Sequence, residues 1–200
     1  MQTPGRKGLA VTDRRSHLLL WLTVGLGLAL DLAAKSFGWN LLGGPPDGGG
    51  REISVIPEWL RLVASRNPGI VFGFNFSESF GIGASGGRLV TVLLTLLTSA
   101  LIFYIFAASR PRQRWLHLAC GLILAGALGN LYDRLFFGFV RDIIQITAHG
   151  QIGGWTLQWP YVFNVADVYL VVGVIVVAVI FMFGRAPDAA ATKTKTSGGC

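Results

Sequence analysis

The stretch Trp115–Phe136 reads WLHLACGLILAGALGNLYDRLF, and it decides the fold class of this chain. Its length is close to the roughly 20 apolar residues that cross a hydrocarbon core of about 30 Å as a helix. Near its end, however, it carries Asn130, Asp133 and Arg134. Polar residues at membrane depth usually face a protein interior and mark a working site. The stretch therefore predicts a membrane helix packed inside a bundle.

Three further segments have the length and apolarity of membrane spans, and the 200-residue chain has a mean hydropathy of +0.56. We predict an all-α membrane protein with four transmembrane helices, a small extracytoplasmic β-sheet and an interfacial segment. The expected parts are an N-terminal segment (1–17), one four-span domain (18–183) and a disordered tail (184–200). The predicted spans are 18–37, 89–108, 115–136 and 162–183.

The basic residues behind the net charge of +7 gather on one side of the predicted spans. Lysines and arginines flank the spans on one side: Arg6, Lys7, Arg14 and Arg15, then Arg110, Arg112 and Arg114, then Arg185, Lys193 and Lys195. The positive-inside rule places both termini in the cytoplasm. This pattern argues against a nucleic-acid partner. The first apolar run is too long for a secretory signal and is interpreted as a retained span.

The two outer loops differ in character. The first contains a Gly/Pro-rich insert (43–50), interpreted as a flexible link, and then strand-like residues at 53–56 and 60–65. The second loop, 147–160, carries three glycines and is expected to be mobile. Cys120 and Cys200 predict neither a disulfide framework nor a metal site, and no cofactor is expected.

Four of the ten acidic residues lie in or beside the spans: Asp31, Asp133, Asp142 and Asp167. At 1.5 Å per helical residue, Asp31 is about 20 Å and Asp133 about 27 Å from the cytoplasmic start of their spans. Asp167 is only about 7 to 8 Å from the outer end of its span by the same rise. All four are therefore expected near the outer face.

Helical spacing divides these carboxylates into two kinds. Asp31 has Lys35 four residues later, and Asp133 has Arg134 beside it, so both are expected to be charge-compensated. Asp142 and Asp167 have no such cation, because the side chain of Arg141 points away from Asp142 in a regular element. Two carboxylates in a dry site share a proton, so one can activate water while the other protonates a carbonyl.

The sequence blocks also resemble those of lipoprotein signal peptidase (signal peptidase II). The resemblance covers about 18–183 and rests on the ordered blocks 126–135 (GALGNLYDRL), 138–142 (GFVRD) and 163–167 (FNVAD), with Asp31, Lys35 and 66–73 (RNPGIVFG) before them. In Ile70 and Val71 the chain has larger residues than the family usually shows.

The resemblance implies an aspartyl endopeptidase of the bacterial inner membrane. It would remove signal peptides from diacylglyceryl-modified prolipoproteins just before the lipidated cysteine, with lipid contacts, as a monomer and without metal or cofactor. By motif, Asp142 and Asp167 would be catalytic. Residues that orient the pair or bind substrate would be Asn67, Asn130, Arg134 and Asn164, and structural polar residues would be Asp31, Lys35 and Asp133.

Simpler roles and rival functions remain open at this point. Lys35 could snorkel to the interface, Asn67 could serve a turn, and Arg134 could form only an ion pair with Asp133. The run 83–87 (GASGG) matches a serine-nucleophile pattern, but it is expected in a loop without a histidine base, the candidates being His17, His117 and His149. A proton-coupled carrier or a structural scaffold would also use intramembrane carboxylates.

Overall fold

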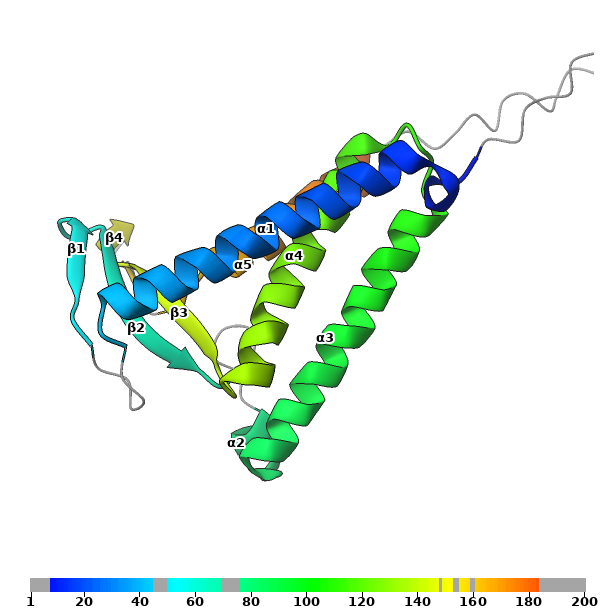
Figure 1. The fold of residues 1–200 in the computed structure, drawn as a ribbon. Coiled ribbons are helices and arrows are strands. Elements are labelled where there is room, and N and C mark those ends of the chain that lie inside the picture. The colour runs from blue at the N-terminus through cyan, green and yellow to red at the C-terminus, as the bar shows by residue number, and fades with distance from the viewer. Residues whose placement is uncertain are drawn as a thin grey trace, which may run out of the picture.

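The computed structural model describes residues 8–44, 50–69, 76–147, 149–152, 155–158 and 161–183. Four helices within these ranges are long and apolar enough to cross a membrane, and they are α1 (Arg14–Leu41), α3 (Gly83–Ala108), α4 (Arg114–Phe136) and α5 (Val165–Phe183). Figure 1 shows α1, α4 and α5 close together with the strands at one end of them, while α3 diverges from α1 towards the start of α3. The predicted fold class, a four-helix membrane protein with a small sheet, is confirmed.

Helix α4 is the centre of the bundle. Two thirds of its apolar window (67%) is buried, against 22% for α1 and 11% for each of α3 and α5, and α4 packs on all three. Small residues allow this packing, because a Cβ on Gly121 would overlap Thr23 of α1 and one on Gly126 would overlap the Ala166 backbone of α5. The apolar outer faces of the other helices are left for lipid.

A four-stranded antiparallel sheet covers one end of the helices. Its strands β1 (Ile53–Ile56), β2 (Leu60–Asn67), β3 (Val140–Ile146) and β6 (Val162–Phe163) follow the order β1-β2-β3-β6. In the register of β2 with β3, Ser65 is opposite Asp142 and Asn67 is opposite Val140. The sheet thus brings Asn67 beside Asp142, although 75 residues separate them along the chain.

The second outer loop also contains regular structure. Its described residues form a two-stranded antiparallel sheet of β4 (His149–Ile152) and β5 (Trp155–Gln158), with Gly150 opposite Leu157. Strands were not expected in this loop, and the mobility expected for 147–160 stays a prediction. Cross-strand hydrogen bonds, which composition does not reveal, join the two strands.

Several element boundaries differ from the sequence-based ranges. Helix α1 begins at Arg14 because Asp13 caps it, accepting a hydrogen bond from the Ser16 backbone N–H (2.8 Å). The last helix begins only at Val165, since Val162 and Phe163 pair with β3. The short elements are η1 (Ala10–Thr12) and α2 (Phe76–Phe80).

The segment 83–87 was expected in a flexible loop, and the structure corrects this. These residues form the first turns of α3, entered through Gly83 at a φ of +69°. A left-handed residue at the start of the helix suits glycine, which has no Cβ to clash. The insert residues 45–49, the pair Ile70 and Val71, and the segments 1–7 and 184–200 lie outside the described residues.

Candidate active site

The nine polar residues singled out in the sequence form one connected network under the sheet. They come from α1 (Asp31, Lys35), β2 (Asn67), α4 (Asn130, Asp133, Arg134), β3 (Asp142) and the start of α5 (Asn164, Asp167). Each is linked to the others by the hydrogen bonds and ion pairs described below. Residues that are far apart in sequence are thus brought together where α1, α4 and α5 meet the sheet (Figure 1).

Asp142 is almost fully buried, with 1% of its surface exposed. Its Oδ2 accepts a hydrogen bond from Asn67 Nδ2 (2.9 Å), and its Oδ1 accepts one from Asn164 Nδ2 (2.6 Å). Burial and the nearby Asp167 carboxylate raise the pKa of Asp142 to about 7 against these amide donors, which act in the opposite direction. Asp142 is therefore suited to hold a proton near neutral pH.

Asp167 is half-buried in the first turn of α5. Its Oδ1 accepts a hydrogen bond from Asn130 Nδ2 (2.9 Å), and its Oδ2 accepts one from the Asn164 backbone N–H (3.0 Å). In return, the Asp167 backbone N–H donates to Asn164 Oδ1 (3.1 Å). This reciprocal pair is a capping box, so the same residues that start the helix also fix the Asp167 carboxylate.

Three asparagine amides surround the two carboxylates, and each is held in one orientation. The side-chain carbonyl of Asn67 accepts from the Gly69 backbone N–H (2.9 Å), and the side-chain carbonyl of Asn130 accepts from Lys35 Nζ (2.9 Å). The Asn164 carbonyl accepts from the Asp167 N–H (3.1 Å). Because each carbonyl oxygen already faces a donor, each NH₂ group must face its carboxylate. Asn164 Nδ2 also contacts Asn130 Oδ1 (3.2 Å), which joins the two halves of the site.

A second group of charges lies behind the carboxylate pair. Lys35 Nζ is 2.8 Å from Asp31 Oδ2 and 3.7 Å from Asp133 Oδ2, and all three side chains are fully buried. Asp31 Oδ1 accepts from the Ala166 backbone N–H (2.9 Å), which ties α1 to α5. Buried charges need such partners, because an unpaired one is strongly destabilising. The pairing of Asp31 with Lys35 that their spacing suggested is present.

The expected pairing of Asp133 with Arg134 is wrong. The partner of Asp133 is Arg141, whose Nη2 lies 2.8 Å from Asp133 Oδ1 and whose backbone N–H donates to Asp133 Oδ2 (2.9 Å). The turn through Gly138, at a φ of +81°, reverses the chain after α4 and sets β3 against it. Helical spacing contains no information on this contact, so sequence reasoning missed Arg141.

Arg134 instead lies next to the backbone of the site. Its Nη2 donates to the backbone carbonyl of Gly69 (2.7 Å), and its Nη1 donates to the backbone carbonyl of Asn130 (3.2 Å). Its Nε is buried without a hydrogen-bond partner in the part of the chain that the structure describes. The guanidinium thus joins α4 to the segment that follows β2 and keeps one donor free.

Two of the three histidines considered for the serine-nucleophile alternative, His17 and His117, lie far from Ser85. Ser85 lies in the first turn of α3, whereas His117 contacts Ser109 at the other end of that 26-residue helix (2.8 Å) and His17 contacts the Val11 carbonyl (2.8 Å). Helical rise separates the two ends by about 35 to 40 Å. Among described residues, no cluster of three His, Cys, Asp or Glu is placed to hold a metal ion.

Comparison with known proteins gives a consistent family. A family model described as "Signal peptidase (SPase) II" matches residues 23–183. Three bacterial relatives are called lipoprotein signal peptidase. The Desulfitobacterium hafniense protein is 36% identical over 78% of this chain and 88% of its own length. The Rhodococcus jostii protein is 35% identical over 89% of this chain and 79% of its own length. The Pseudomonas syringae pv. tomato protein is 34% identical over 80% of this chain and 82% of its own length.

Solved structures share the fold. One described as "Bacterial membrane enzyme structure by the in meso method at 2.3 A resolution" superposes with a TM-score of 0.62 at 24% identity, covering 90% of this chain and 94% of its own. At this identity the likeness concerns the fold alone. The extent of the family match over all four helices, together with the relatives above 30% identity, confirms the resemblance of the sequence blocks: the chain belongs to the signal peptidase II family of bacterial membrane proteases.

Proposed function

We propose that this protease removes the signal peptide from diacylglyceryl-modified prolipoproteins, cutting immediately before the lipidated cysteine, with Asp142 and Asp167 as its catalytic pair. The relatives at 34–36% identity are called lipoprotein signal peptidases, which supports the substrate class. The observation that carries the catalytic assignment is the amide bridge between the pair. Asn164 donates to Asp142, Asn130 donates to Asp167, and the two asparagines contact each other.

The proton positions follow from the surroundings of each carboxyl group. With its pKa raised to about 7, Asp142 holds the shared proton at the start of the reaction, and the more exposed Asp167 serves as the base. Asp167 accepts a proton from a water as that water attacks the scissile carbonyl, and Asp142 donates its proton to the carbonyl oxygen. As the C–N bond breaks, Asp167 passes its proton to the leaving amine, and a hydroxyl of the tetrahedral intermediate returns a proton to Asp142 as the carbonyl re-forms.

The surrounding residues position these two groups. The fixed amides of Asn67, Asn130 and Asn164 hold the carboxylates without competing for the proton, because an amide does not titrate near neutral pH. Arg134 donates to the Gly69 backbone carbonyl, and its remaining Nε–H is one further donor for a substrate carbonyl or a lipid phosphate oxygen. Asp31, Lys35 and Asp133 act through position alone.

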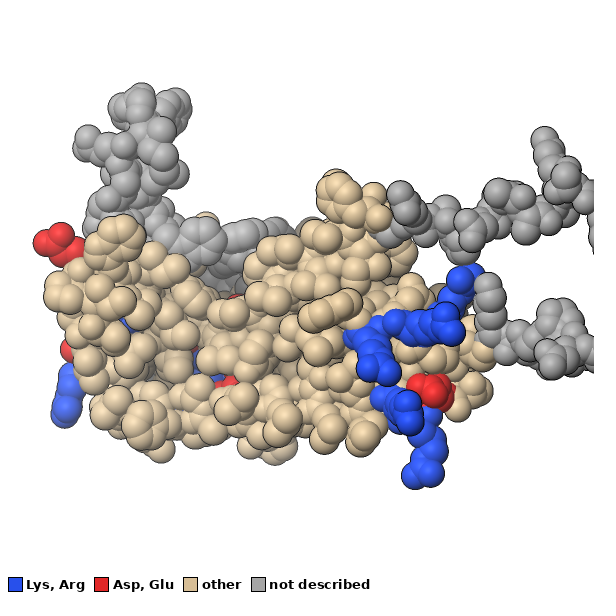
Figure 2. All heavy atoms as spheres, turned by 90° about the horizontal axis from the view of Figure 1, so that it is seen from above, with Lys and Arg blue, Asp and Glu red and all other residues tan. Residues whose placement is uncertain are grey.

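The orientation in the membrane is part of the proposal. The exposed residues Arg14, Arg15, Arg110, Arg112 and Arg114 lie at the end of the helices away from the sheet, so the positive-inside rule puts the sheet and the aspartates at the outer face. Figure 2 shows basic side chains gathered at that far end of the helices. The acyl chains of the substrate would then lie in the outer leaflet while its backbone reaches the aspartates.

The test is cleavage of a purified diacylglyceryl-prolipoprotein by the full-length protein in detergent. Asp142→Asn and Asp167→Asn should each reduce the rate by at least about 10³-fold, since each removes one proton-transfer partner. Glu52→Gln, at an exposed ion pair with Arg61, is the matched control and should cleave normally. Activity retained by either aspartate variant, or equal cleavage of the unlipidated precursor, would refute the proposal.

A further inference from the structure

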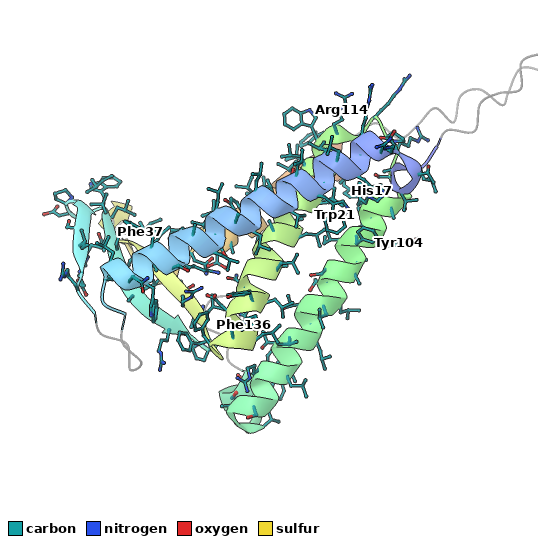
Figure 3. All side chains as sticks on the ribbon, viewed as in Figure 1. His17, Trp21, Phe37, Tyr104, Arg114 and Phe136 are labelled. Carbon is teal, nitrogen blue, oxygen red and sulfur yellow. The ribbon has the colours of Figure 1, made fainter. Side chains whose placement is uncertain are left out.

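A cavity of about 640 Å³ lies at the end of the bundle opposite the aspartates, apart from the proposed active site. Its walls come from the start of α1, the connection after α3 and the start of α4. The lining residues are Asp13, Arg15, Ser16, Leu19, Pro111, Arg112, Arg114 and His117. Figure 3 shows Arg114 at this end of the molecule, near His17 and Trp21.

The charge of the cavity is positive. Arg15, Arg112 and Arg114 are exposed, and none of them forms an ion pair within the described residues. The single acidic lining residue, Asp13, caps α1 by accepting from the backbone N–H and the Oγ of Ser16 (2.8 and 2.7 Å). Three guanidinium groups against one engaged carboxylate leave a net attraction for an anion.

Helix α4 adds unpaired donors to the same place. Its N-cap residue, Gln113, forms no side-chain capping hydrogen bond to the first turn, because its Oε1 accepts from the Arg110 N–H instead (2.7 Å). The first N–H groups of a 23-residue helix are therefore left to an external acceptor, at the positive end of its dipole.

His117 forms the inner wall of the cavity. It lines the cavity, is fully buried, and has no hydrogen-bond partner for Nδ1 among the described residues. Ser109 Oγ donates to the Phe106 carbonyl (2.6 Å) and contacts His117 Nε2 (2.8 Å). The attraction of the cavity for an anion therefore rests on the arginines and on the start of α4.

We propose that this cavity binds the phosphate-bearing headgroup of an anionic phospholipid. A lipid is favoured over a soluble phosphate because apolar surface adjoins the cavity. Trp115 follows Arg114 and is 73% exposed, and Leu19 lines the wall. Tryptophans at this position suit the membrane interface, and basic pockets between helices there bind lipid headgroups.

The terminal segments are poor alternative occupants on charge grounds. Residues 1–7 contain Arg6 and Lys7 and no acidic side chain, and residues 184–200 contain three basic side chains and one acidic one. Like charges would repel a basic cavity at this distance. The proposal concerns the end of the bundle and does not depend on which aspartates cleave substrate.

The test is lipid binding to the purified full chain in neutral detergent, followed by native mass spectrometry. Phosphatidylglycerol and phosphatidylcholine with the same acyl chains are titrated against the wild type, Arg112→Gln/Arg114→Gln, and the control Arg14→Gln/Arg110→Gln. Both double variants lose two positive charges at the same end, but the control arginines do not line the cavity. Unfolding temperatures in detergent alone establish that both variants are folded.

We expect the wild type to bind phosphatidylglycerol in preference to phosphatidylcholine. The cavity variant should lose about tenfold or more in phosphatidylglycerol affinity, and the control less than about threefold. Equal losses in both variants would mean diffuse attraction and would overturn the proposal, as would equal binding of the two lipids. Displacement of bound phosphatidylglycerol by millimolar glycerol phosphate or inorganic phosphate would assign the cavity to a soluble anion instead.

Discussion

Lys35 donates a hydrogen bond from Nζ to the side-chain carbonyl of Asn130 (2.9 Å), across 95 residues of sequence. This contact joins the buried charges of α1 to the carboxylate pair, because it turns the Asn130 amide so that its NH₂ group meets Asp167 (2.9 Å). A lysine that could have served only to reach the interface is thus fully buried and acts through another residue. Its role is to position a donor.

The first prediction concerns Lys35→Met, which keeps the volume and removes the charge. Asp31 and Asp133 then lose an ammonium within 2.8 and 3.7 Å, and Asp31 has no other cation close by in the described structure. Leaving a buried carboxylate unpaired costs about 3 to 5 kcal/mol. Thermal unfolding in detergent should show a large fall in the unfolding temperature of this variant, and the variant should not cleave prolipoprotein.

Arg61→Gln is the control for this change. Arg61 pairs with Glu52 at 2.9 Å, but their side chains are 41% and 60% exposed. An exposed pair contributes only about 0 to 1 kcal/mol. If the Lys35 variant were as stable as the Arg61 variant, the ammonium would not be compensating the aspartates.

The second prediction separates two tasks of Asn164. Its Oδ1 caps α5 by accepting from the Asp167 N–H, while its Nδ2 donates to Asp142. Asn164→Ala loses both functions, and the missing cap alone costs about 1 kcal/mol. Asn164→Ser retains a capping oxygen but loses the donor to Asp142. The serine variant should therefore recover stability relative to alanine without recovering cleavage.

Both variants are measured by unfolding temperature and by prolipoprotein cleavage in the same preparation. Recovery of both properties by serine would mean that Asn164 serves the helix alone. Recovery of neither would mean that the cap has little weight here.

The sequence predicted the members of the site better than their partners. Spacing along α4 and α5 put Asn130, Asp133 and Arg134 on one face and Asn164 beside Asp167, because helical periodicity is a local property. The partner of Asp133 could not be found in this way, since Arg141 reaches it only after the chain reverses at Gly138. Pairing across a turn depends on backbone angles that composition does not fix.

The outer segments show the same limit. Strands at 53–56 and 60–65 were indicated by strand-forming residues and alternation, and the structure contains both, with the second continuing to Asn67. The hairpin of β4 and β5 was missed because its glycines indicate a loop whether or not the strands pair. The start of α5 was placed too early, since an apolar strand and an apolar helix look alike in hydropathy.

The third prediction is the pH dependence of stability. The pKa of Asp142 is about 7 in the folded protein against an ordinary value of 3.8, so between these values the folded state binds more protons than the unfolded chain. The stabilisation is complete below about pH 4 and is lost as the pH rises through about 7. Unfolding temperatures should therefore fall from pH 5 to pH 8.

Asp142→Asn supplies the comparison, because the amide has a similar shape and does not titrate. The difference in unfolding temperature between the wild type and this variant should shift against the wild type as the pH rises. A shift in favour of the wild type would mean that the folded protein prefers the ionised form of Asp142. The rate of cleavage by the wild type should decline as the pH rises above about 7, because Asp142 then loses the shared proton.

The last prediction concerns Gly129, in the middle of the motif that contains Asn130, Asp133 and Arg134. A Cβ at this position would overlap Asp31 Oδ2 and lie 3.1 Å from its Cγ, so Gly129→Ala must displace the carboxylate that binds Lys35 and the Ala166 N–H. Alanine normally stabilises a helix by about 0.5 to 1 kcal/mol over glycine. Here we expect a loss of stability and of cleavage.

Gly25→Ala in α1 is the matched substitution, because a Cβ there meets nothing within 4 Å. It should raise the unfolding temperature by the ordinary helix propensity and leave cleavage unchanged. The two variants make the same chemical change in helices of the same bundle, so a difference of opposite sign can only come from what the new methyl group touches. If Gly129→Ala were also stabilising, Asp31 would have room to move, and its contacts with Lys35 and α5 would not be holding the site in one arrangement.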